Sequence, residues 1–490
     1  MSRRLIVMKF GGTSVGNAAC FRQCAEIVSK AAQQDRVMVV VSAMAGVTDL
    51  IFKTIEAARH ADTAVTEMHL QEFRQVHREL ISNLFDPGRH PAALEFVEQI
   101  SEQLQRACHA LSALRSDISA QTTDSLVGLG ERISSWVLAH YLQQSGVAGE
   151  YVRAEDILIT NNNFGNAAPD MEATRAACQA TLLPLLQRDA IPVIAGYSGC
   201  TADGRTATLG RGGSDYSATI LGAASGADEV WIWTDVDGVL SADPRICPDA
   251  TVLPEITFAE AIELAYYGAK VIHPKAAFPA MNAGFSVWIK NSFRPDAPGT
   301  RITRSTSSPI NSPVKSVTCV KSATLITLVT RRDVHPVELW GRLFLRMGQE
   351  QTEVLFATQS SPEHALGLVL RKEDSPAVLK MIQNIFRLEL AQGVLAPVEV
   401  DNDVAVVAVL GESMKGKCGV LGRLFAAVAH QRVSVIAVAQ GASELSICFA
   451  VPAASAADVV SAVHGEFCHR REEAVPGCMG PTLAAMSGAQ

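Results

Sequence analysis

Short runs of Val and Ile recur through the first 300 residues, and each is bounded by glycine or polar residues and followed by a helical pattern. They lie at residues 5–8, 37–41, 191–195, 229–233 and 285–290. Continuous apolar runs of this length are typical of strands that are buried on both faces, as in a parallel sheet covered by helices. We therefore predict an α/β domain over residues 1–300 with a mainly parallel sheet, interrupted by a helical excursion at about 48–114.

A different pattern begins after residues 301–316, a stretch rich in Ser, Thr and Pro that we interpret as a linker. The chain then reads β-α-β-β-α twice, which predicts two ligand-sensing modules at 317–400 and 401–469 that arose by duplication. The second strand of each repeat runs into a matching phrase that contains Gln359 or Gln440. Residues 470–490 are rich in Gly, Ala and Pro and are predicted to form a flexible tail.

Charge and composition exclude several classes of protein. The 490 residues carry 42 basic and 50 acidic side chains, a net charge of −8, so a broad basic surface for nucleic acid is absent. No apolar stretch reaches the eighteen or so residues of a membrane span, and the N-terminal run is too short for a signal peptide. The eleven cysteines show no regular spacing. We therefore expect a cytoplasmic protein with reduced thiols that binds neither nucleic acid nor membrane.

A glycine turn follows the first predicted strand, in the string KFGGTSVG at 9–16. Paired glycines let the backbone approach a phosphate, and the start of the next helix offers free N–H groups. Lys9 would place a positive charge where negative charge builds on a transferring phosphoryl group. A tight strand–helix turn would explain the glycines alone, but it would not explain the lysine and the two hydroxyl groups beside them.

A second Gly-Gly turn, LGRGGSDYS at 209–217, also opens a predicted helix. Ser214 and Asp215 stand where N-cap and first-turn residues belong. A guanidinium beside such a turn, here Arg211, is a good receptor for a carboxylate or phosphate. A merely capped helix with a solvent-facing Arg211 is the simpler alternative, but two anion-binding turns in one domain make it the weaker one.

Three further strings complete the set. WTDVDGV at 233–239, followed by DPR at 243–245, comes after a buried strand, at the edge of the sheet where open α/β folds bind ligands. Its alternating Asp235 and Asp237 resemble the start of a calcium loop, but the later ligands are missing. GAKVIHP at 268–274 carries Lys270 at a helix end, and GLGER at 128–132 places Glu131 at a helix start.

Together these strings resemble the aspartate kinases of the amino-acid kinase superfamily. KFGGTSV, SAMAGVT, GERISS, LGRGGSDYSA, WTDVDGV with DPR, and GAKVIHP occur in the family's order, and the duplicated C-terminal pattern resembles its paired ACT domains. Several multi-residue strings in one order are far more specific than any single motif. The resemblance implies an amino-acid kinase fold followed by two βαββαβ ACT domains.

Carried over position by position, the resemblance implies a role for each matching residue. Lys9 and Asp215 would be catalytic, with Asp215 aligning the lysine and the substrate. Aspartate would be bound by Ser42, Thr48, Glu131, Arg211, Gly212, Gly213 and Ser214. ATP would be bound by Lys9, Gly11, Gly12, Thr234, Asp235, Leu240, Arg245, Lys270 and Val271. Leu240 replaces a tyrosine common in the family, which puts one nucleotide contact in doubt.

The reaction implied is transfer of the γ-phosphoryl group of ATP to the β-carboxylate of L-aspartate, the first step of lysine, threonine and methionine synthesis. The attacking carboxylate is already ionised at neutral pH, so no general base is needed. Mg²⁺ would bridge the phosphates with few protein ligands, and no dedicated metal site is expected. The resemblance also implies a homodimer or a dimer of dimers.

Two alternatives stay open. The same fold could phosphorylate another small acid, such as N-acetylglutamate, glutamate or carbamate, although Glu131 favours a substrate with a free α-ammonium group. Alternatively, the chain could be a catalytically silent amino-acid sensor, but the presence of Lys9, Arg211 and Asp215 argues against that. The stretch 462–467 resembles the start of the linker in bifunctional aspartate kinase–homoserine dehydrogenases, and we interpret the chain as the kinase and sensor half alone.

Regulation is expected at the ACT repeats. The phrase VAQGASE at 438–444 resembles the threonine-sensitive branch of the family, so threonine is the predicted effector, with lysine as the alternative. Gln359 and Gln440 would contact it, since an amide can both donate and accept hydrogen bonds. The first repeat lacks the glycine found at 419 in the second, so one site could be closed.

Two other groupings mimic functional motifs. GESMKGKC at 411–418 nearly fits a phosphate-binding Walker A loop, but Cys418 stands where a hydroxyl should meet magnesium. We interpret its glycines as turn residues of the ACT repeat. Cys20 with Cys24, and His464 with Cys468 and His469, lack the second half of a metal site, so we interpret them as ordinary thiols and surface imidazoles.

Overall fold

The computed structural model describes residues 3–114, 118–269, 272–306, 312–331, 336–360 and 364–469. The chain divides into two compact units. The first comprises Met1–Val239, Val252–Ile262 and Val271–Thr306, and the second comprises Leu240–Thr251, Glu263–Lys270 and Ser307–Gln490. The tail predicted at 470–490 lies outside the described residues.

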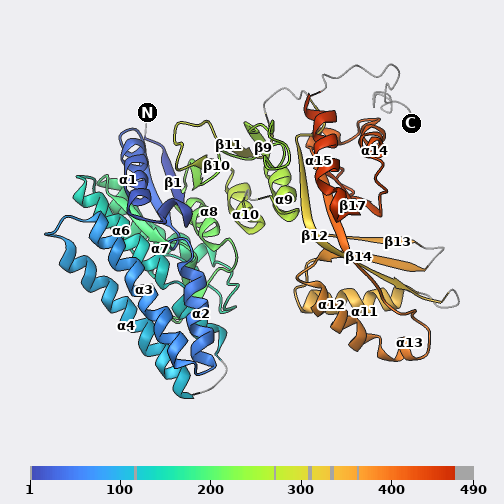
Figure 1. Ribbon diagram of the computed structural model, residues 1–490. Coiled ribbons are helices and arrows are strands. Elements are labelled where there is room, and N and C mark those ends of the chain that lie inside the picture. Colours follow the sequence, from blue (N-terminus) through green and yellow to red (C-terminus); the bar gives the residue numbers. More distant parts are fainter. Residues whose placement is uncertain are drawn as a thin grey trace, which may run out of the picture. The chain divides into compact units, whose positions relative to one another are not determined.

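A mainly parallel sheet forms the centre of the first unit (Figure 1). Its described strands follow the order β3-β5-β2-β1-β8-β10-β11-β9, and only β10 and β11 run antiparallel. In chain order they are β1 (Leu5–Phe10), β2 (Arg36–Val41), β3 (Gly149–Val152), β5 (Ile191–Ala195), β8 (Glu229–Thr234), β9 (Glu255–Thr257), β10 (Ser286–Asn291) and β11 (Thr300–Thr303). Every residue of β1 and β5 is buried, as their unbroken apolar runs predicted.

Helices cover both faces of this sheet. On one face α1 (Ala18–Ala32) packs against β2, and α6 (Leu129–Gln144) packs against β2, β3 and β5. On the other face α7 (Met171–Gln187) packs on β5, and α8 (Gly213–Ser225) packs on β1, β2 and β8, with α10 (Pro274–Ala283) against α8. This arrangement puts the carboxyl end of each central strand next to the start of a helix.

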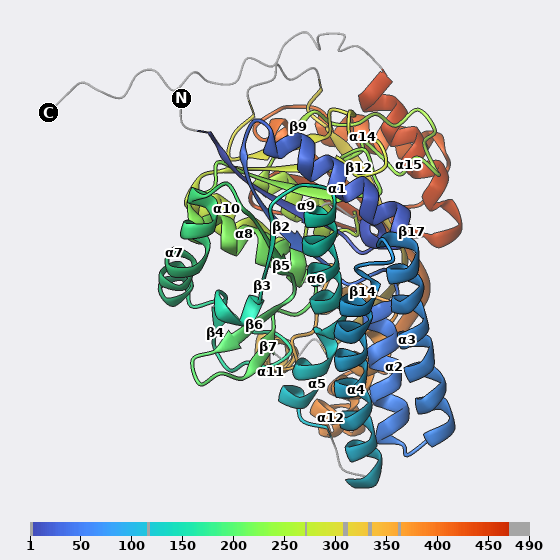
Figure 2. The ribbon, with the colours of Figure 1, turned by 90° about the vertical axis from the view of Figure 1, so that its left-hand side faces the viewer.

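The helical excursion predicted at about 48–114 is confirmed. It consists of α2 (Val47–Arg59), α3 (Thr63–Leu84) and α4 (His90–Leu114), which run side by side (Figure 2). Here α3 packs on α1 and α4 packs on α6, so the excursion extends the helical layer of one face of the sheet. The short helix α5 (Ala120–Val127) leads from it into α6.

The first unit also contains a second, smaller sheet. β4 (Ile159–Thr160), β6 (Ser198–Thr201) and β7 (Thr206–Thr208) form it in the order β4-β6-β7 among the described strands. β7 leads directly into the glycine turn at 210–213, so this sheet fixes where that turn begins.

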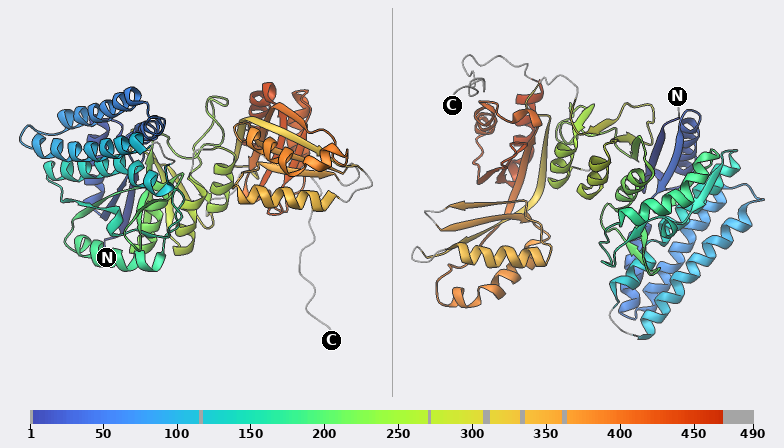
Figure 3. Two further views of the ribbon diagram at one scale, coloured as in Figure 1. Left: turned by 90° about the horizontal axis from the view of Figure 1, so that it is seen from below. Right: turned by 180° about the vertical axis from the view of Figure 1, so that it is seen from behind.

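The second unit is built on an antiparallel sheet of order β13-β14-β12-β15-β17-β16 in the described residues. The first β-α-β-β-α repeat consists of β12 (Ser316–Val329), α11 (Pro336–Gln349), β13 (Phe356–Ser360), β14 (Ala365–Arg371) and α12 (Ser375–Ile385), followed by α13 (Arg387–Ala391). The second repeat consists of β15 (Glu399–Leu410), α14 (Val420–His430), β16 (Ala437–Gln440), β17 (Ser446–Pro452) and α15 (Ala456–His464). The predicted duplication is therefore visible in the strand order, which mirrors itself about β12 and β15. Figure 3 shows this sheet and its helices, coloured yellow to red.

The two central strands of this sheet serve both repeats. β12 pairs with β14 through residues 323–329 and with β15 through residues 316–327, with register shifts in the β15 pairing between residues 320 and 325. Val317 consequently joins the core of α14 and α15, whereas Ile326 joins the core of α11 and α12. The predicted bounds of the repeats, 317–400 and 401–469, therefore do not separate two independent cores along the chain.

Two further features differ from the sequence prediction. Residues 301–303, expected in the linker, belong to β11, where Ile302 is fully buried, so Thr300–Thr303 is a strand of the first unit's sheet, between β10 and β9. The segment Leu240–Thr251 belongs to the second unit, because Ala242 and Cys247 lie in the core of α14 and α15. None of the described helices combines the length and apolar character that crossing a membrane would require.

Candidate active site

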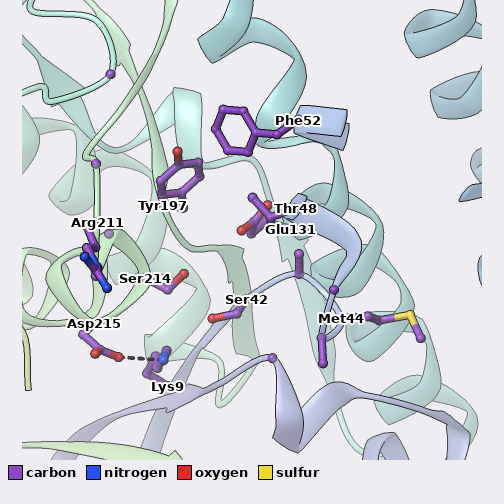
Figure 4. A pocket seen from close by; sticks show the side chains of 18 residues that line it. Lys9, Ser42, Met44, Thr48, Phe52, Glu131, Tyr197, Arg211, Ser214 and Asp215 are labelled. Carbon is purple, nitrogen blue, oxygen red and sulfur yellow. Dashed lines mark ion pairs between the residues drawn. The ribbon is translucent and has the colours of Figure 1, made fainter. Parts of the chain in front are cut away.

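The centre of the candidate site is an ion pair between the first strand and α8. Lys9 is the second-to-last residue of β1. Its Nζ lies 2.6 Å from Oδ1 of Asp215 in the first turn of α8 (Figure 4). Both side chains are largely buried, at 11% and 18% exposed. A methyl group on Gly11 would lie 3.6 Å from this Nζ, so the glycine leaves the ammonium group accessible to a ligand.

The turn before α8 is shaped by glycines that no other residue could replace. Gly212 is the N-cap residue of α8 with φ of +71°, and a Cβ there would lie 2.4 Å from Cβ of His273. Ser214, expected as an N-cap residue, lies inside the helix instead. No side chain caps α8, so its first N–H groups are open to a ligand.

Two more helices begin at the same pocket. α2 starts after Gly46, with φ of +83°, and α6 starts after Gly128, and neither is capped by a side chain. Thr48 lies in the first turn of α2, and Ser42 follows β2, with its N–H donated to the carbonyl of Phe10. Open helix starts favour bound anions, so the starts of α8 and α2 suit a ligand with negative groups, whereas Glu131 lies at the start of α6.

Glu131 provides the opposite charge. It lies in the first turn of α6, it is only 4% exposed, and its Oε2 has no hydrogen-bond partner in the described structure. Burial raises the pKa of this carboxyl from its usual value to about 7, against the opposing effects of backbone N–H groups and Lys9. A desolvated carboxylate with an unused oxygen is a binding site for a cation.

The pocket enclosed by these groups has a volume of about 550 Å³. Ten of the predicted residues line it, namely Lys9, Gly12, Ser42, Thr48, Glu131, Arg211, Gly212, Gly213, Ser214 and Asp215. Arg211 stands across the pocket from Glu131 and Thr48 (Figure 4). Its side chain is exposed, and no carboxylate of the described residues lies within ion-pair distance. The pocket thus separates a cationic side from an anionic side.

The residues predicted to bind nucleotide are distributed differently. Gly11 adjoins the end of β8, since its N–H donates to the carbonyl of Trp233 at 3.0 Å, which brings Thr234 and Asp235 beside the glycine turn. Leu240 and Arg245 belong to the second unit, where Arg245 forms a bidentate pair with Asp243 at 2.8 and 2.9 Å. Lys270 and Val271 lie outside the described residues.

Several residues of the pocket are not predicted as site residues by the sequence analysis. Tyr197, Phe52 and Met44 line it, and Tyr197 has a φ of +71°, unusual for an aromatic residue. Asp124 is buried behind the pocket, and its carboxylate accepts the N–H groups of Gly165 and Thr208 at 2.8 and 2.7 Å. These contacts hold the loop of Gly165, which lines the pocket, against β7.

The other groupings carry no metal chemistry in the structure. The described residues contain no cluster of three His, Cys, Asp or Glu side chains that could hold a metal ion, and the ten cysteines described are free thiols. The interpretation of His464 as a surface imidazole is wrong. Its ring is buried, with Nε2 2.9 Å from Oγ of Ser241. The 411–418 string forms the turn between β15 and α14.

Comparison with known proteins agrees with this geometry. The sequence profile of the amino acid kinase family matches residues 4–291, and that of an ACT domain matches residues 407–467. The lysine-sensitive aspartokinase 3 of Escherichia coli is 32% identical over 461 residues, which cover 94% of this chain and 98% of that protein. The chain belongs to the aspartokinase family.

Solved structures of the family show the same fold. The crystal structure of E. coli aspartokinase III in complex with aspartate and ADP (R-state) matches with a TM-score of 0.79 at 30% identity, covering 94% of this chain and 99% of that one. The complex with lysine and aspartate (T-state) matches with a TM-score of 0.77 at 31% identity and the same coverage. The predicted amino-acid kinase fold followed by ACT domains is thereby confirmed.

Other members of the family are longer. The bifunctional aspartokinase/homoserine dehydrogenase of Haemophilus influenzae is 31% identical over 468 residues, which cover 94% of this chain and 56% of that protein. The chain therefore spans about half the length of these bifunctional relatives.

Proposed function

We propose that the protein is an aspartate kinase that transfers the γ-phosphoryl group of ATP to the β-carboxylate of L-aspartate, giving 4-phospho-L-aspartate. The observation that carries this proposal is the placement of Glu131 opposite Arg211 in one pocket. The ion pair of Lys9 and Asp215 and the glycine turns line the same pocket. The E. coli relative solved with aspartate and ADP supports the same pair of substrates.

The charges of the pocket match those of aspartate. Glu131 accepts the α-ammonium group, which supplies the partner that its buried Oε2 lacks. Arg211 can bind a carboxylate through two parallel hydrogen bonds, and Ser214 and the open start of α8 add donors beside it. An N-acylated substrate would leave Glu131 buried without a cation, which disfavours kinases of N-acetylglutamate. Free glutamate and carbamate stay as alternatives for direct assay.

The chemical step needs charge stabilisation more than proton transfer. The β-carboxylate attacks the γ-phosphorus as an anion, and ADP leaves, so no proton has to be removed from the nucleophile. Lys9 stabilises the negative charge that develops on the transferring group, while Asp215 holds its ammonium group in position. Buried, pre-oriented charges act strongly here because little solvent has to reorganise.

The nucleotide would be held by the turn at Gly11 and Gly12, with Thr234 and Asp235 beside it. For Leu240, Arg245, Lys270 and Val271 a role in nucleotide binding stays a prediction from the sequence resemblance alone. Mg²⁺, which would neutralise phosphate charge when bound, would be held mainly through phosphate oxygens, with few protein ligands.

A hydroxylamine trapping assay tests the activity. With ATP, Mg²⁺ and L-aspartate, the acyl phosphate formed should be trapped as aspartyl hydroxamate at a rate well above that with N-acetylglutamate, glutamate or bicarbonate with ammonia. The surface variant Lys380→Ala should behave as wild type. If the enzyme turns over another acid preferentially, that acid replaces aspartate as the proposed substrate. If no acid supports the consumption of ATP, the protein is better explained as a silent sensor.

We also propose that a small amino acid regulates the enzyme through the ACT repeats. A pocket of about 360 Å³ lies at the start of α14, where Gln440, Lys417 and Glu444 supply polar groups and Met414 and Ile447 supply apolar contacts. Gly419 opens this helix with φ of +83° and no side-chain cap, which suits a carboxylate. Polar groups of both signs beside apolar ones fit a zwitterion with a short side chain.

The first repeat carries an amide at the matching place. Gln359 pairs with Leu366 as Gln440 pairs with Ile447, so the two amides occupy equivalent positions on edge strands. Residues 332–335 and 361–363 lie outside the described residues. We assign the main effector site to the second repeat, on the basis of the pocket beside Gln440.

Threonine is the effector we propose, on the likeness of the 438–444 phrase to the threonine-sensitive branch. The lysine complex of the E. coli relative makes lysine the direct competitor for this assignment. Titration of wild-type activity with threonine, lysine and methionine at sub-saturating aspartate separates them. Inhibition by lysine alone would overturn the threonine assignment and leave the kinase assignment intact.

The proposed activity places the protein at the entry to lysine, threonine and methionine synthesis. The predicted homodimer or dimer of dimers is part of the same proposal. Sedimentation with and without threonine would test both the assembly and its link to the effector.

A further inference from the structure

A second pocket of the first unit lies on the other face of the sheet from Lys9. It has a volume of about 380 Å³ and shares no lining residue with the catalytic pocket. One wall is the outer part of α1, and the other is the surface of β8 and β10 with Trp231, Trp233 and Lys290. Strand register explains the separation, since Lys9 pairs with Ile232 whereas Lys290 pairs with Trp233, and successive residues of a strand face opposite sides.

Lys290 is held by aromatic rings. Its Nζ lies 5.4 Å from the ring centre of Trp231, 5.6 Å from that of Trp233 and 5.3 Å from that of Trp288. Among the described residues, no carboxylate lies within 4.0 Å of this ammonium group. Burial lowers the pKa of Lys290, with only a distant opposing effect of Glu229. The cation is therefore partly desolvated and has ring faces in place of a counter-ion.

The carboxylates around the pocket are engaged elsewhere. Asp35 accepts the guanidinium of Arg4 at 2.9 and 3.1 Å, and Glu229 accepts Nε1 of Trp231 at 2.8 Å. Lys30, the other lysine of the lining, pairs with Asp296 at 3.0 Å. Glu26 also lines the pocket but is exposed on α1. The unmatched charge in the interior of the pocket is thus the positive charge of Lys290.

The remaining surface favours a flat partner. The rings of Trp231 and Trp233 stand at 69° with centroids 6.2 Å apart, so they offer a face and an edge to a planar group. Nε1 of Trp233, a residue that lines the pocket, is a buried donor without an acceptor in the described structure. Ligand sites typically combine apolar walls with a few polar groups in a volume of about 300–1,000 Å³.

We propose that this pocket binds a small planar organic anion, with its carboxylate at Lys290 and its ring against the indoles. The bound carboxylate supplies the counter-ion that Lys290 lacks and an acceptor for Nε1 of Trp233. The site belongs to the first unit alone and does not depend on which substrate the catalytic pocket takes.

The test uses the full chain and benzoate as the probe, with benzamide as the neutral planar analogue and cyclohexanecarboxylate as the non-planar anion. Benzoate should bind with a dissociation constant of about 1 mM or tighter and quench tryptophan fluorescence, whereas the two analogues should bind at least about 10-fold more weakly. Calorimetry at two ionic strengths would give the affinities directly.

Variants test whether benzoate binds at Lys290 and the indole rings. Lys290→Met should weaken benzoate binding at least about 10-fold, Lys290→Arg should keep it within about 3-fold, and Glu26→Gln should tighten it. Lys380→Met, a lysine of α12 outside the pocket, is the matched charge control. If Lys290→Met does not fold, the arginine and glutamine variants still decide the matter.

Three results would overturn the proposal. Equal binding of benzamide and benzoate would make the pocket a plain apolar site. Unchanged affinity in Lys290→Met, or an equal loss in Lys380→Met, would remove Lys290 from the site. Quenching that grows with protein concentration in the absence of benzoate would make this face a self-association surface instead.

Discussion

The catalytic pocket and the pocket of the second ACT repeat both use a helix that starts at a left-handed glycine, Gly212 for α8 and Gly419 for α14, and neither helix is capped by a side chain. They differ in what surrounds that start. At α8 the ion pair of Lys9 and Asp215 is largely buried. At α14 the polar side chains of Gln440 and Lys417 are exposed, and that of Glu444 is half-buried.

This difference suits two different tasks. Buried and fixed charges cost little reorganisation when a transition state forms, so they are strong catalysts. Exposed groups exchange a ligand for water, so each contributes modestly and binding stays reversible. We therefore expect substitutions in the catalytic pocket to change rates and affinities by orders of magnitude, and those in the effector pocket by much less.

Lys9→Ala should show the largest effect. Because its charge acts mainly on the transferring phosphoryl group, we expect kcat to fall by at least about 10²-fold with little change in ATP affinity. Steady-state kinetics with a separate measurement of nucleotide binding checks this, with Lys380→Ala as the control. Collapsed ATP affinity with preserved turnover at saturation would make Lys9 a ground-state anchor.

Arg211→Ala should come next. Loss of a bidentate, charge-assisted contact should raise KM for aspartate by about 10- to 100-fold and change KM for ATP little. Arg211→Lys keeps the charge without the planar fork, so it should recover only part of the affinity. An equal loss for both substrates would instead move Arg211 to the phosphate side of the pocket.

The residues addressed by these two variants were predictable because each stands in a glycine-containing string at the end of a strand or the start of a helix. Tyr197 and Asp124 had no such signal. The left-handed backbone of Tyr197 cannot be inferred from its residue type, and Asp124 looks like an ordinary helical acid. Its role comes from contacts 41 and 84 residues away along the chain.

The fold shows the same limit. The runs of β1 and β5 and the period of α1 are local patterns, and the structure places them as expected. The segment Leu240–Thr251 was assigned to the kinase domain because it follows β8 directly. It joins the second unit because Ala242 and Cys247 complete a core formed about 170–220 residues later, and tertiary packing of this kind leaves no local pattern.

The pH dependence of aspartate binding tests the burial of Glu131. Its carboxylate must be ionised to bind an ammonium group, and its pKa is about 7 in the empty pocket. Between pH 8 and pH 6 the ionised fraction falls from about 0.9 to about 0.1, so KM for aspartate should rise by about 10-fold. In Glu131→Gln, KM should be high at both pH values. A flat wild-type profile would mean that Glu131 does not bind the ammonium group.

The same burial should make the empty protein more stable at low pH. The pKa of Glu131 in the folded protein lies above the unfolded value, so its contribution is fully present below about pH 4.5 and is lost as pH rises through about 7. Glu131→Gln removes this loss. The Tm of the variant relative to wild type should therefore be higher at pH 8 than at pH 5.5, by about 2–4 °C for a domain of this size. A difference that does not depend on pH would contradict the burial cost.

Gln440→Ala should have the smallest effect and decides whether the comparison of the two pockets holds. A neutral hydrogen bond at an exposed site contributes about 0.5–1.5 kcal/mol, so the threonine concentration for half-inhibition should rise by about 3- to 10-fold while uninhibited kcat stays unchanged. Gln359→Ala is the matched control, since it removes the equivalent amide of the first repeat.

Inhibition also requires threonine to prefer the less active state, because equal binding to both states does not shift the equilibrium between them. A 100-fold loss of inhibition in Gln440→Ala would mean that the effector pocket closes around its ligand and resembles the catalytic pocket. Unchanged inhibition in both variants would place the effector elsewhere, while a loss in Gln359→Ala alone would move it to the first repeat.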